Sequence, residues 1–431
     1  MKNKKKYIFI IIILLLCSII IYLLNENHGL KESSNNYENN KVTKRENMLS
    51  MMLETEAGSG NYEMTTRESW PTEGYVFNSE LSVCENGGEL SWDDENKRVL
   101  MSGNVSDKCY VYFDIYVPPT IADFCNSGDT LTTCVKNFGN QGTDMSNIYI
   151  HNSGLTNGAG DNSYRFAGAS DAVNNYVCFG TNTTPCPTDN LYRIIGVFGD
   201  QVKLIKYDYA NSNLLGTDGD YSTNTYSKSE YPPYNEYSAY KGELTTINGY
   251  YWNNSTGNNT WSESNLNKVN LNTNFINNIR SEWAAKIAET TWKVGGAKNT
   301  GGQPSEAYQN EIVSPDTTET TDGATEYSAK IGLMYASDYG FAAAPSAWIS
   351  DMNSYGSTSI TSVNWMYMGL PEWTISRDAS DTMYAFRVYT VGYVNYDYIN
   401  SSNGVRPSFN LLSSVTYVEG DGTKNLPIRI N

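Results

Sequence analysis

The sequence predicts an α+β protein in which an N-terminal transmembrane helix and a small antiparallel β unit precede a larger mixed domain. Three observations support this prediction. The first 25 residues contain a long apolar run. Short β-type runs separated by turn residues follow from about residue 69. A hairpin pattern and then an amphipathic helix pattern occur further along the chain. The length of 431 residues fits roughly two or three domains.

Composition and charge argue against several classes of function. The chain has 30 basic and 47 acidic residues and a net charge of −17, which disfavours a nucleic-acid partner because phosphate binding needs clustered Lys and Arg. It has only two histidines, His28 and His151, which exclude multi-histidine metal sites and argue against Ser-His-Asp chemistry. We expect no metal and no cofactor. Only 18% of residues are charged and 34 are tyrosine, so uncharged polar and aromatic groups should form much of the surface.

Residues 1–25 are predicted to form a cytoplasmic tail and a transmembrane anchor. Residues 7–24 contain no charge, and as a helix they would measure about 27 Å, nearly the thickness of a bilayer core. A cleaved signal peptide is the alternative, but the run exceeds an ordinary signal core and no small-residue cleavage site follows it. The preceding lysines should stay in the cytoplasm. The expected localisation is therefore the cell membrane, with a single pass and an extracellular C-terminal domain.

Residues 26–68 are predicted to form a stalk. Residues 25–45 are polar and cannot bury enough surface to fold alone. The apolar residues between Met48 and Leu53 predict a short helix lying on the next domain, and an interface or membrane-proximal role is equally open.

Residues 69–120 are predicted to form the small antiparallel β unit. Turn-rich Asn, Gly and Asp clusters separate its strands, and residues 93–96 are a credible hairpin turn. Pro118 and Pro119 mark its end. The predicted strands are 75–77, 89–92, 98–101 and 110–113.

Six cysteines follow the apolar segment, and disulfides in an exported protein are the favoured interpretation, with free thiols as the alternative. Six cysteines allow 15 pairings, so the connectivity stays open. The nearest-neighbour set would close loops of 24, 8 and 7 intervening residues. The absence of a C-x-x-C sequence argues against a zinc ribbon or a thioredoxin-like site. The candidates are Cys84, Cys109, Cys125, Cys134, Cys178 and Cys186.

Residues 121–431 are predicted to form the C-terminal α+β recognition domain. Residues 191–198 and 201–206 are two β-rich runs joined by a tight Gly199-Asp200 turn, which predicts a hairpin. Residues 211–262 are polar and tyrosine-rich, which favours a surface loop.

A helix is predicted from about residue 275, because apolar residues recur every four positions from there, and Thr273 or Asn274 can cap its start. Gly295 and Gly296 prevent its continuation. The apolar stripe consists of Phe275, Ile279, Trp283 and Ile287.

Several further elements are predicted towards the C-terminus. Residues 328–334 predict a strand, and Ser337-Asp338 should cap a short helix. Three β-type runs follow, at 371–376, 385–388 and 391–395. In the last run, 404–411, alternate residues share one face. Pro407 lacks an amide donor, so this strand should lie at an edge or start there.

Four sequence motifs occur along residues 160–431. They are Tyr192-Arg193-Ile194-Ile195, Thr260-Trp261-Ser262, Leu333-Met334-Tyr335 with Asp338-Tyr339, and Gly404-Val405-Arg406-Pro407. Together these motifs resemble a widespread family of functionally uncharacterised bacterial surface and exported domains, and residues 46–116 resemble modules that precede them. The ending is similar to that of formylglycine-generating enzymes and C-type-lectin-like domains, which implies a C-type-lectin-like mixed fold. Formylglycine formation would need a reactive cysteine late in the domain, and none follows Cys186.

Aromatic residues beside amide and acidic groups are the candidate ligand contacts, because such rings stack on sugar faces while their neighbours bond hydroxyl groups. The alternatives are that the tyrosines pack on one another and that the arginines are structural anchors. Five tryptophans are expected in the core: Trp261, Trp283, Trp292, Trp365 and Trp373. The candidate ligand-binding residues are Tyr234, Tyr237, Tyr393, Tyr396, Tyr398, Arg387 and Arg406.

Two acidic motifs offer weaker alternatives. Asp218-x-Asp220 begins like a calcium loop but lacks the glycine and the closing glutamate, so a solvated turn is favoured. Glu372 with Asp378 or Asp381 could form a catalytic carboxylate pair.

The expected function is that of a membrane-anchored extracellular binding or adhesion protein, not an enzyme. It would recognise a glycan or a protein at the cell surface and contact the membrane through residues 7–24. The alternatives are a pilus-like or structural envelope component and, third, an envelope enzyme.

Overall fold

In the computed structural model the described residues are 49–103, 107–227, 240–255, 257–298, 301–315 and 324–431. The chain divides between Pro118 and Pro119 into two compact units. The predicted transmembrane segment at residues 7–24 lies outside the described residues. Among the helices that are described, none has the length and apolar character needed to cross a bilayer.

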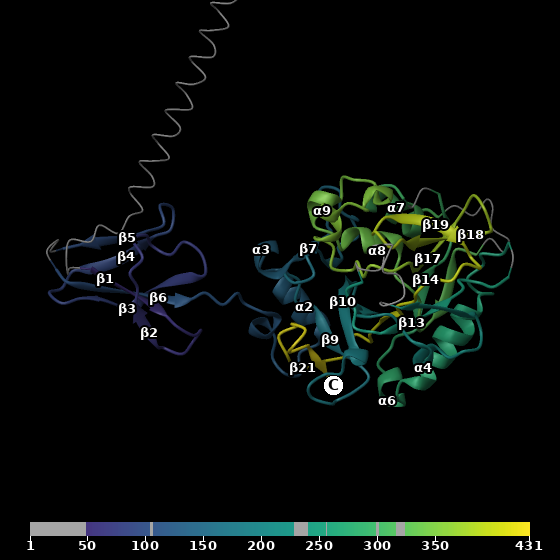
Figure 1. The fold of residues 1–431 in the computed structure, drawn as a ribbon, viewed down its shortest axis with the longest axis horizontal. Coiled ribbons are helices and arrows are strands. Elements are labelled where there is room, and N and C mark those ends of the chain that lie inside the picture. Colours follow the sequence, from purple (N-terminus) through teal and green to yellow (C-terminus); the bar gives the residue numbers. More distant parts are fainter. Residues whose placement is uncertain (1–48, 104–106, 228–239, 256, 299–300, 316–323) are drawn as a thin grey trace, which may run out of the picture. The chain divides into compact units, whose positions relative to one another are not determined.

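The first unit is a β structure (Figure 1). Its four-stranded sheet has the order β2-β1-β6-β3, and β4 and β5 form a separate hairpin. The predicted hairpin turn at residues 93–96 joins β4 to β5. The strands are β1 (Leu49–Glu54), β2 (Tyr62–Met64), β3 (Tyr75–Cys84), β4 (Glu89–Asp93), β5 (Arg98–Ser102) and β6 (Cys109–Ile115).

The apolar cluster expected to form a short helix is instead strand β1, so the helix prediction was wrong. β1 pairs in parallel with β6, and Met51 lies opposite Val111. Both residues are buried in the core of this unit with Trp70 and Phe113. The run Leu-Ser-Met-Met-Leu is too short for its period to distinguish helix from strand. Pairing with a strand about 60 residues later decides its conformation.

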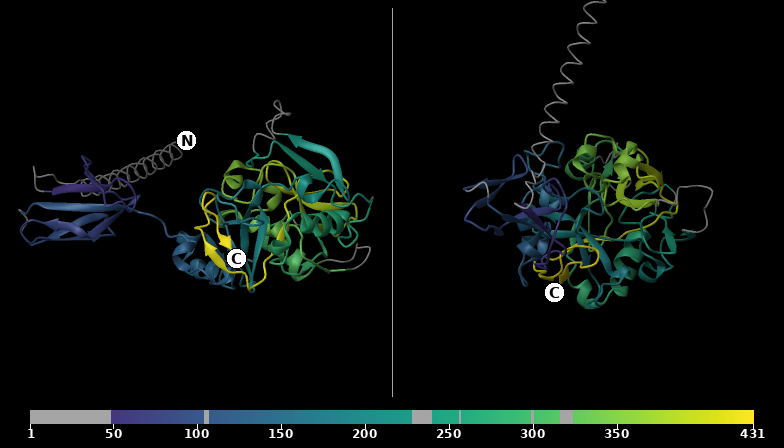
Figure 2. Two further views of the ribbon diagram at one scale, coloured as in Figure 1. Left: turned by 90° about the horizontal axis from the view of Figure 1, so that it is seen from below. Right: turned by 60° about the vertical axis from the view of Figure 1, so that its left-hand side comes forward.

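The second unit is a mixed α+β structure, which confirms the predicted class. Its largest sheet has the order β20-β11-β10-β8-β7, with β9 also pairing with β10. Figure 2 shows the C-terminal segment, in yellow, against the teal strands of this sheet. The strands are β7 (Ile148–Ile150), β8 (Tyr164–Phe166), β9 (Tyr176–Cys178), β10 (Leu191–Phe198), β11 (Gln201–Lys206) and β20 (Ser408–Asn410).

A second sheet of the same unit has the order β15-β17-β18-β19. Three two-stranded ribbons pair β12 with β13, β14 with β16, and β21 with β22. The strands are β12 (Tyr221–Ser227), β13 (Thr246–Tyr250), β14 (Thr290–Lys293), β15 (Gly296–Ala297), β16 (Glu326–Ala329), β17 (Glu372–Asp378), β18 (Tyr384–Val388), β19 (Val394–Tyr398), β21 (Tyr417–Glu419) and β22 (Arg429–Ile430).

Short helical segments surround these sheets. The α-helices are α2 (Leu131–Gly139), α3 (Thr143–Ser146), α4 (Ser212–Leu215), α5 (Ile276–Asn278), α6 (Ser281–Ala284), α7 (Pro304–Tyr308), α8 (Ala336–Phe341) and α9 (Thr358–Thr361). The 3-10 and π segments are η1 (Ile121–Phe124), η2 (Thr188–Asn190), η4 (Leu266–Phe275), η5 (Gln309–Val313), η6 (Pro345–Ala347) and η7 (Met352–Ser354).

The strongest hairpin prediction is confirmed, because β10 and β11 pair antiparallel around Gly199 and Asp200. The expected surface loop at 211–262 is wrong in part. Its strands β12 and β13 pair, and both Tyr250 and Trp252 are completely buried. Aromatic residues within a polar run thus contribute to the core.

The predicted helix starts earlier than expected and is interrupted. Helical structure begins at Leu266, but Ile279 and Arg280 adopt extended backbone, with ψ of 148° and 149°, before α6 starts. All four stripe residues are nevertheless buried. The apolar pattern therefore predicted burial correctly and helix continuity incorrectly.

The last predicted run, 404–411, is confirmed in part, because only its residues 408–410 form a strand and that strand lies at an edge. Strand β20 begins directly after Pro407 and is the outermost strand of its sheet. Three disulfides are also present, with the nearest-neighbour connectivity: Cys84–Cys109, Cys125–Cys134 and Cys178–Cys186. The five tryptophans expected in the core are each no more than 2% exposed.

Candidate binding site

A hollow of about 230 Å³ in the second unit brings charged, aromatic and amide side chains together. It lies between the large sheet, strand β14, helix α8 and segments α7 and η5. We call it the charged hollow. Its lining consists of Asp161, Arg165, Phe198, Lys203, Thr290, Thr291, Trp292, Lys293, Tyr308, Ile312, Tyr335, Ser337, Asp338 and Asn410.

The sheet register places the polar residues of the hollow in one row. Arg165 on β8 lies opposite Gly196 on β10, Gly196 lies opposite Lys203 on β11, and Lys203 lies opposite Asn410 on β20. Residues directly opposite each other project from the same face of a sheet. A Cβ atom at Gly196 would lie 2.3 Å from the Tyr164 carbonyl oxygen, so the close approach of the strands requires glycine there.

Asp338 joins the two cations of this row. Its carboxylate accepts a hydrogen bond from Lys203 Nζ at 2.5 Å and from Arg165 Nη1 at 3.2 Å. Arg165 Nη2 also donates to Asp161 at 2.8 Å. The side chains of Lys203, Arg165 and Asp338 are at most 5% exposed. Two cations and two carboxylates therefore form a neutral, paired cluster, as buried charges require.

Burial and pairing act in opposite directions on these groups. Burial lowers the pKa of Lys203, and the Asp338 carboxylate opposes that shift. Burial raises the pKa of Asp161, but the Arg165 guanidinium and hydrogen bonds from Ser163 outweigh it and hold the pKa below its usual value. Aromatic rings close the cluster from the sides: the Arg165 guanidinium lies 4.6 Å from the centre of the Phe198 ring, and Lys203 Nζ lies 4.6 Å from that of Tyr335.

Asn410 lines the hollow and carries an unpaired acceptor that is itself buried. Its amide nitrogen donates to Thr290 Oγ1 at 3.1 Å, whereas the buried Oδ1 atom has no hydrogen-bond partner in the described part of the chain. Leaving a buried acceptor unsatisfied costs about 1–3 kcal/mol. A ligand hydroxyl or amide N–H would satisfy it.

The short helix predicted after Tyr335, α8, positions Asp338. Asp338 is the third residue of α8, and its Oδ2 atom accepts the backbone N–H of Tyr335 at 3.0 Å. A residue suited to a helix start thereby also serves as the acceptor for both buried cations.

None of the predicted ligand-binding residues of the C-terminal strands lines the charged hollow, and they divide between the two faces of their sheet: Tyr396 and Tyr398 project from one face and Arg387 from the other. Tyr396 and Tyr398 on β19 are 54% and 50% exposed, and both rings contact Tyr384. Arg387 on the neighbouring strand is bound to Asp397 and to two asparagines. The Tyr393 ring stacks on that of Tyr389 at 5.1 Å. Tyr234 and Tyr237 lie outside the described residues.

Arg406 is not at a surface, so the expectation that it contacts a ligand differs from the structure. It is 1% exposed, and Nε donates to Glu372 at 2.7 Å. Nη2 donates to the Met366 carbonyl oxygen at 2.7 Å. Both members of the pair are buried, so Arg406 anchors the core and Glu372 is not free to act in a carboxylate pair.

The acidic motif at 218–224 does not form a solvated turn. Asp220 is 1% exposed, and its carboxylate accepts the backbone N–H groups of Asn254 at 3.0 Å and Leu266 at 2.8 Å. It therefore caps the start of η4.

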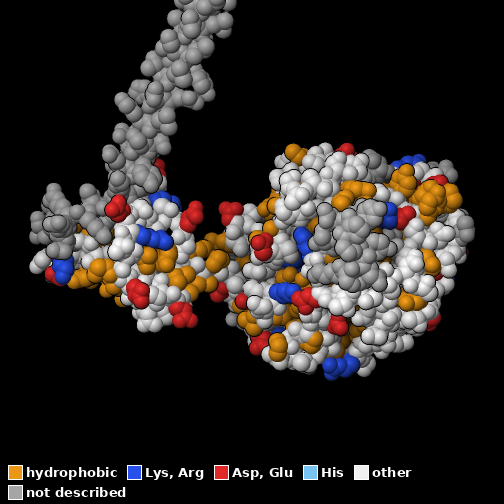
Figure 3. Space-filling model, in the orientation of Figure 1, with side chains coloured by type: hydrophobic (Ala, Val, Ile, Leu, Met, Phe, Trp, Pro, Cys, Tyr) orange, Lys and Arg blue, Asp and Glu red, His pale blue; other side chains and the backbone are white. Residues whose placement is uncertain are grey.

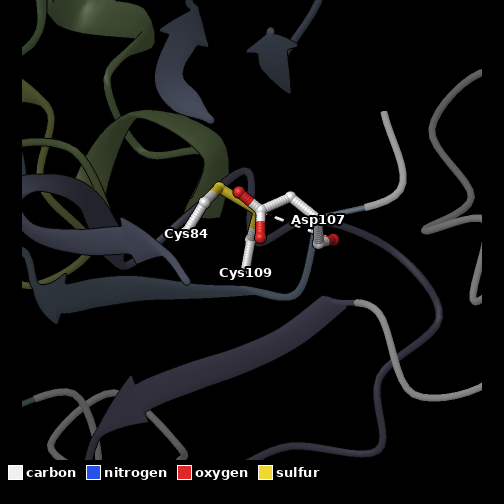
Figure 4. A group of neighbouring side chains, drawn as sticks. All are labelled: Cys84, Asp107 and Cys109. Carbon is white, nitrogen blue, oxygen red and sulfur yellow. Dashed lines mark hydrogen bonds between the residues drawn. A yellow bond between two sulfur atoms is a disulfide. The ribbon is translucent and has the colours of Figure 1, made fainter. Parts of the chain in front are cut away.

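One cluster with metal-binding residue types is already occupied by a covalent bond. Figure 4 shows Asp107 beside the Cys84–Cys109 disulfide. The Asp107 carboxylate accepts backbone N–H bonds from Asn86 at 2.9 Å and Gly88 at 3.0 Å. Disulfide sulfurs are not thiolate ligands, so this cluster stabilises a turn next to the disulfide.

The residues of the charged hollow were not identified by sequence. The available signal was Lys203 within the apolar run Val-Lys-Leu-Ile-Lys, where a buried lysine must find an acceptor. Its partner Asp338 lies 135 residues later. Only the fold brings these residues together.

The second unit is thus an α+β domain whose main sheet carries a hollow with largely apolar walls and a paired charge cluster. Residues 200–413 match the model of a family described as a domain of unknown function, DUF6273. That range includes Lys203, Asp338 and Asn410 but not Arg165. No curated protein and no solved structure matches the chain.

Proposed function

We propose that this chain is a membrane-anchored extracellular binding protein whose second unit recognises a neutral glycan through the charged hollow. The observation that carries the proposal is the unused Asn410 acceptor beside a neutralised charge cluster. Binding sites combine apolar walls with a few polar groups that fix the orientation of the ligand.

The chemistry of the hollow favours a hydroxyl-bearing ring over a charged ligand. Arg165 and Lys203 are neutralised by Asp161 and Asp338, so an added anion would displace an existing carboxylate. A hydroxyl group can donate to Asn410 Oδ1 and accept from a neighbouring donor. The volume of about 230 Å³ lies just below the roughly 300–1,000 Å³ typical of sites for drug-sized ligands, so one sugar ring is a suitable occupant.

Further observations support display outside the cell. Three disulfides are typical of proteins in oxidising compartments. Residues 7–24 have the composition of a membrane anchor. On the face drawn in Figure 3, most of the second unit carries neither acidic nor basic side chains. A C-type-lectin-like fold and a separate ligand contact by Tyr396 and Tyr398, away from the charged hollow, belong to this proposal.

Glycan-array binding by the purified full-length chain tests the proposal, using a variant that fills the hollow. Thr291 is exposed on β14 at the hollow, so Thr291→Trp should block the hollow without disturbing the core. Thr223→Trp, at an exposed position of β12, is the matched control. We expect the wild type and the control to bind a neutral glycan on the array and Thr291→Trp to lose this binding. Equal binding by all three proteins, or binding to no neutral glycan by a folded chain, would contradict the proposal.

Asn410→Leu tests the carrying observation directly. It removes an unsatisfied buried acceptor while keeping the side-chain shape, so the chain should stay folded. We expect glycan affinity to fall about tenfold or more, since a buried hydrogen bond in such a site contributes on the order of 1.4 kcal/mol.

Cell-surface display is tested separately by adding protease to intact cells. The proposal requires degradation of residues 49–431 with survival of a membrane-bound N-terminal fragment. Full protection of the chain in intact cells would contradict it.

A further inference from the structure

A second hollow, of about 250 Å³, lies beside Lys206 in the second unit. Lys206 is three residues after Lys203 on β11, so the two side chains project from opposite faces of the sheet. Its cross-strand partner Tyr192 also lines this second hollow. The hollow is therefore distinct from the charged hollow.

Lys206 differs from Lys203 in lacking a partner. The residue is 1% exposed, and its Nζ atom has no hydrogen-bond acceptor among the described residues. An unpaired buried cation is costly in a protein interior. Such a group in the floor of a hollow indicates that a ligand supplies the missing negative charge.

The remaining walls provide a second cation and several amides. Arg280 lies where the helical structure is interrupted between α5 and α6. Among the described residues its guanidinium forms an exposed ion pair with Glu282 and a hydrogen bond to Thr181 Oγ1, each at 3.4 Å. Asn211, Asn213 and Asn278 line the same space. Amides of this kind bond hydroxyl groups, whereas the two cations attract a carboxylate.

Asp189 also lines the second hollow and is exposed. It forms no ion pair with Lys206, but it shares the space into which an anion would bind. A bound anion would therefore be attracted by Lys206 and Arg280 and repelled by Asp189, and it would compete with Glu282 for the Arg280 guanidinium.

We propose that the hollow beside Lys206 is a binding site for an acidic sugar, with the carboxylate held between Lys206 and Arg280 and the hydroxyl groups on the asparagine amides. The Nζ atom lies beneath the surface of the floor, so Lys206 acts on the carboxylate through its charge across a short distance of low dielectric. Arg280 and the amides make the direct contacts.

Calorimetric titration of the full-length chain with glucuronate and with glucose tests this site, because the two probes share a ring and differ in the carboxylate. We expect glucuronate to bind and glucose to bind at least tenfold more weakly. Lys206→Met should weaken glucuronate binding on the order of tenfold or more. This variant removes an unpaired buried charge, so it should remain folded. Asp189→Asn should strengthen binding.

Lys268→Met is the matched control, since Lys268 is an exposed lysine of η4 outside the hollow. It should leave glucuronate binding unchanged, as should Thr291→Trp in the charged hollow. Equal affinity for glucose and glucuronate, insensitivity to Lys206→Met, or preferential binding of inorganic phosphate would each overturn the proposal. Failure here with retained glycan binding at the charged hollow would leave the proposed function intact.

Discussion

Replacing Arg406 by methionine separates a structural role of this residue from a role in ligand binding. The Arg406 guanidinium donates to Glu372 and to a backbone carbonyl, at 2.7 Å in each case. The side chains are 1% and 2% exposed. Burial disfavours the charged guanidinium, yet the Glu372 carboxylate holds the pKa of Arg406 above its usual value. The contact is thus a buried ion pair.

Removing one partner of such a pair leaves the other charge buried and uncompensated. The expected loss in free energy of unfolding for Arg406→Met is about 3–5 kcal/mol. Glu372→Gln keeps an acceptor but removes the counter-charge, so a loss of similar size, about 3 kcal/mol, is expected. The double variant should cost much less than the sum of the two, because the second substitution removes a charge that the first has left unpaired.

Urea unfolding followed by tryptophan fluorescence measures these losses. Seven of the nine tryptophans lie between residues 252 and 373, so the signal reports mainly on the second unit. Arg280→Met is the control, because that guanidinium is 60% exposed and its removal should cost less than about 1 kcal/mol. A loss below about 1 kcal/mol for Arg406→Met, or full additivity in the double variant, would refute the reasoning.

Three further outcomes follow from other buried groups. Burial raises the pKa of Glu311 to about 7. Between pH 4.5 and 7 the unfolded chain loses this proton while the folded chain keeps it, so the free energy of unfolding falls by about 3 kcal/mol as the pH rises. Urea titrations at pH 5 and 7.5 measure this fall, and Glu311→Gln should remove it. Opening the Cys84–Cys109 disulfide with a double serine variant should destabilise the first unit by about 3–4 kcal/mol and leave the second unchanged, which two-transition calorimetry can measure. Asp220→Ala should cost about 1–3 kcal/mol, and added calcium should leave the wild-type Tm unchanged because backbone N–H groups already occupy that carboxylate.

The sequence predicted correctly those elements that neighbouring residues determine. The hairpin around Gly199 follows from two β-rich runs and a two-residue turn, and the edge position of β20 follows from Pro407. The helix break at Arg280 could not be predicted, because the apolar spacing continues through it unchanged. Strand β1 could not be predicted because its conformation depends on pairing with β6.

The candidate site could not be predicted because its residues come from distant parts of the chain. Arg165 and Asp338 are 173 residues apart in sequence, and each is an ordinary charged residue in its local context. The high tyrosine content drew attention to exposed tyrosines, whereas the composition gave almost no indication of the buried charge cluster of Arg165, Lys203 and Asp338. Arg406 illustrates the opposite error: a residue prominent in a motif is a core anchor.

The two lysines of β11 have different environments, and the two binding proposals depend on that difference. Lys203 meets Asp338 on one face of the sheet, so that face is electrically balanced and suits a neutral ligand. Lys206 lies on the other face, where its Nζ atom has no hydrogen-bond acceptor among the described residues, and our second proposal assigns an anion to that face. The three-residue spacing is what separates the two faces, since strand side chains alternate. A carboxylate placed near Lys206 would give this lysine a partner like the one that Lys203 has. Leu214→Asp introduces such a carboxylate at the hollow beside Lys206. It should abolish glucuronate binding and leave glycan binding at the charged hollow unchanged.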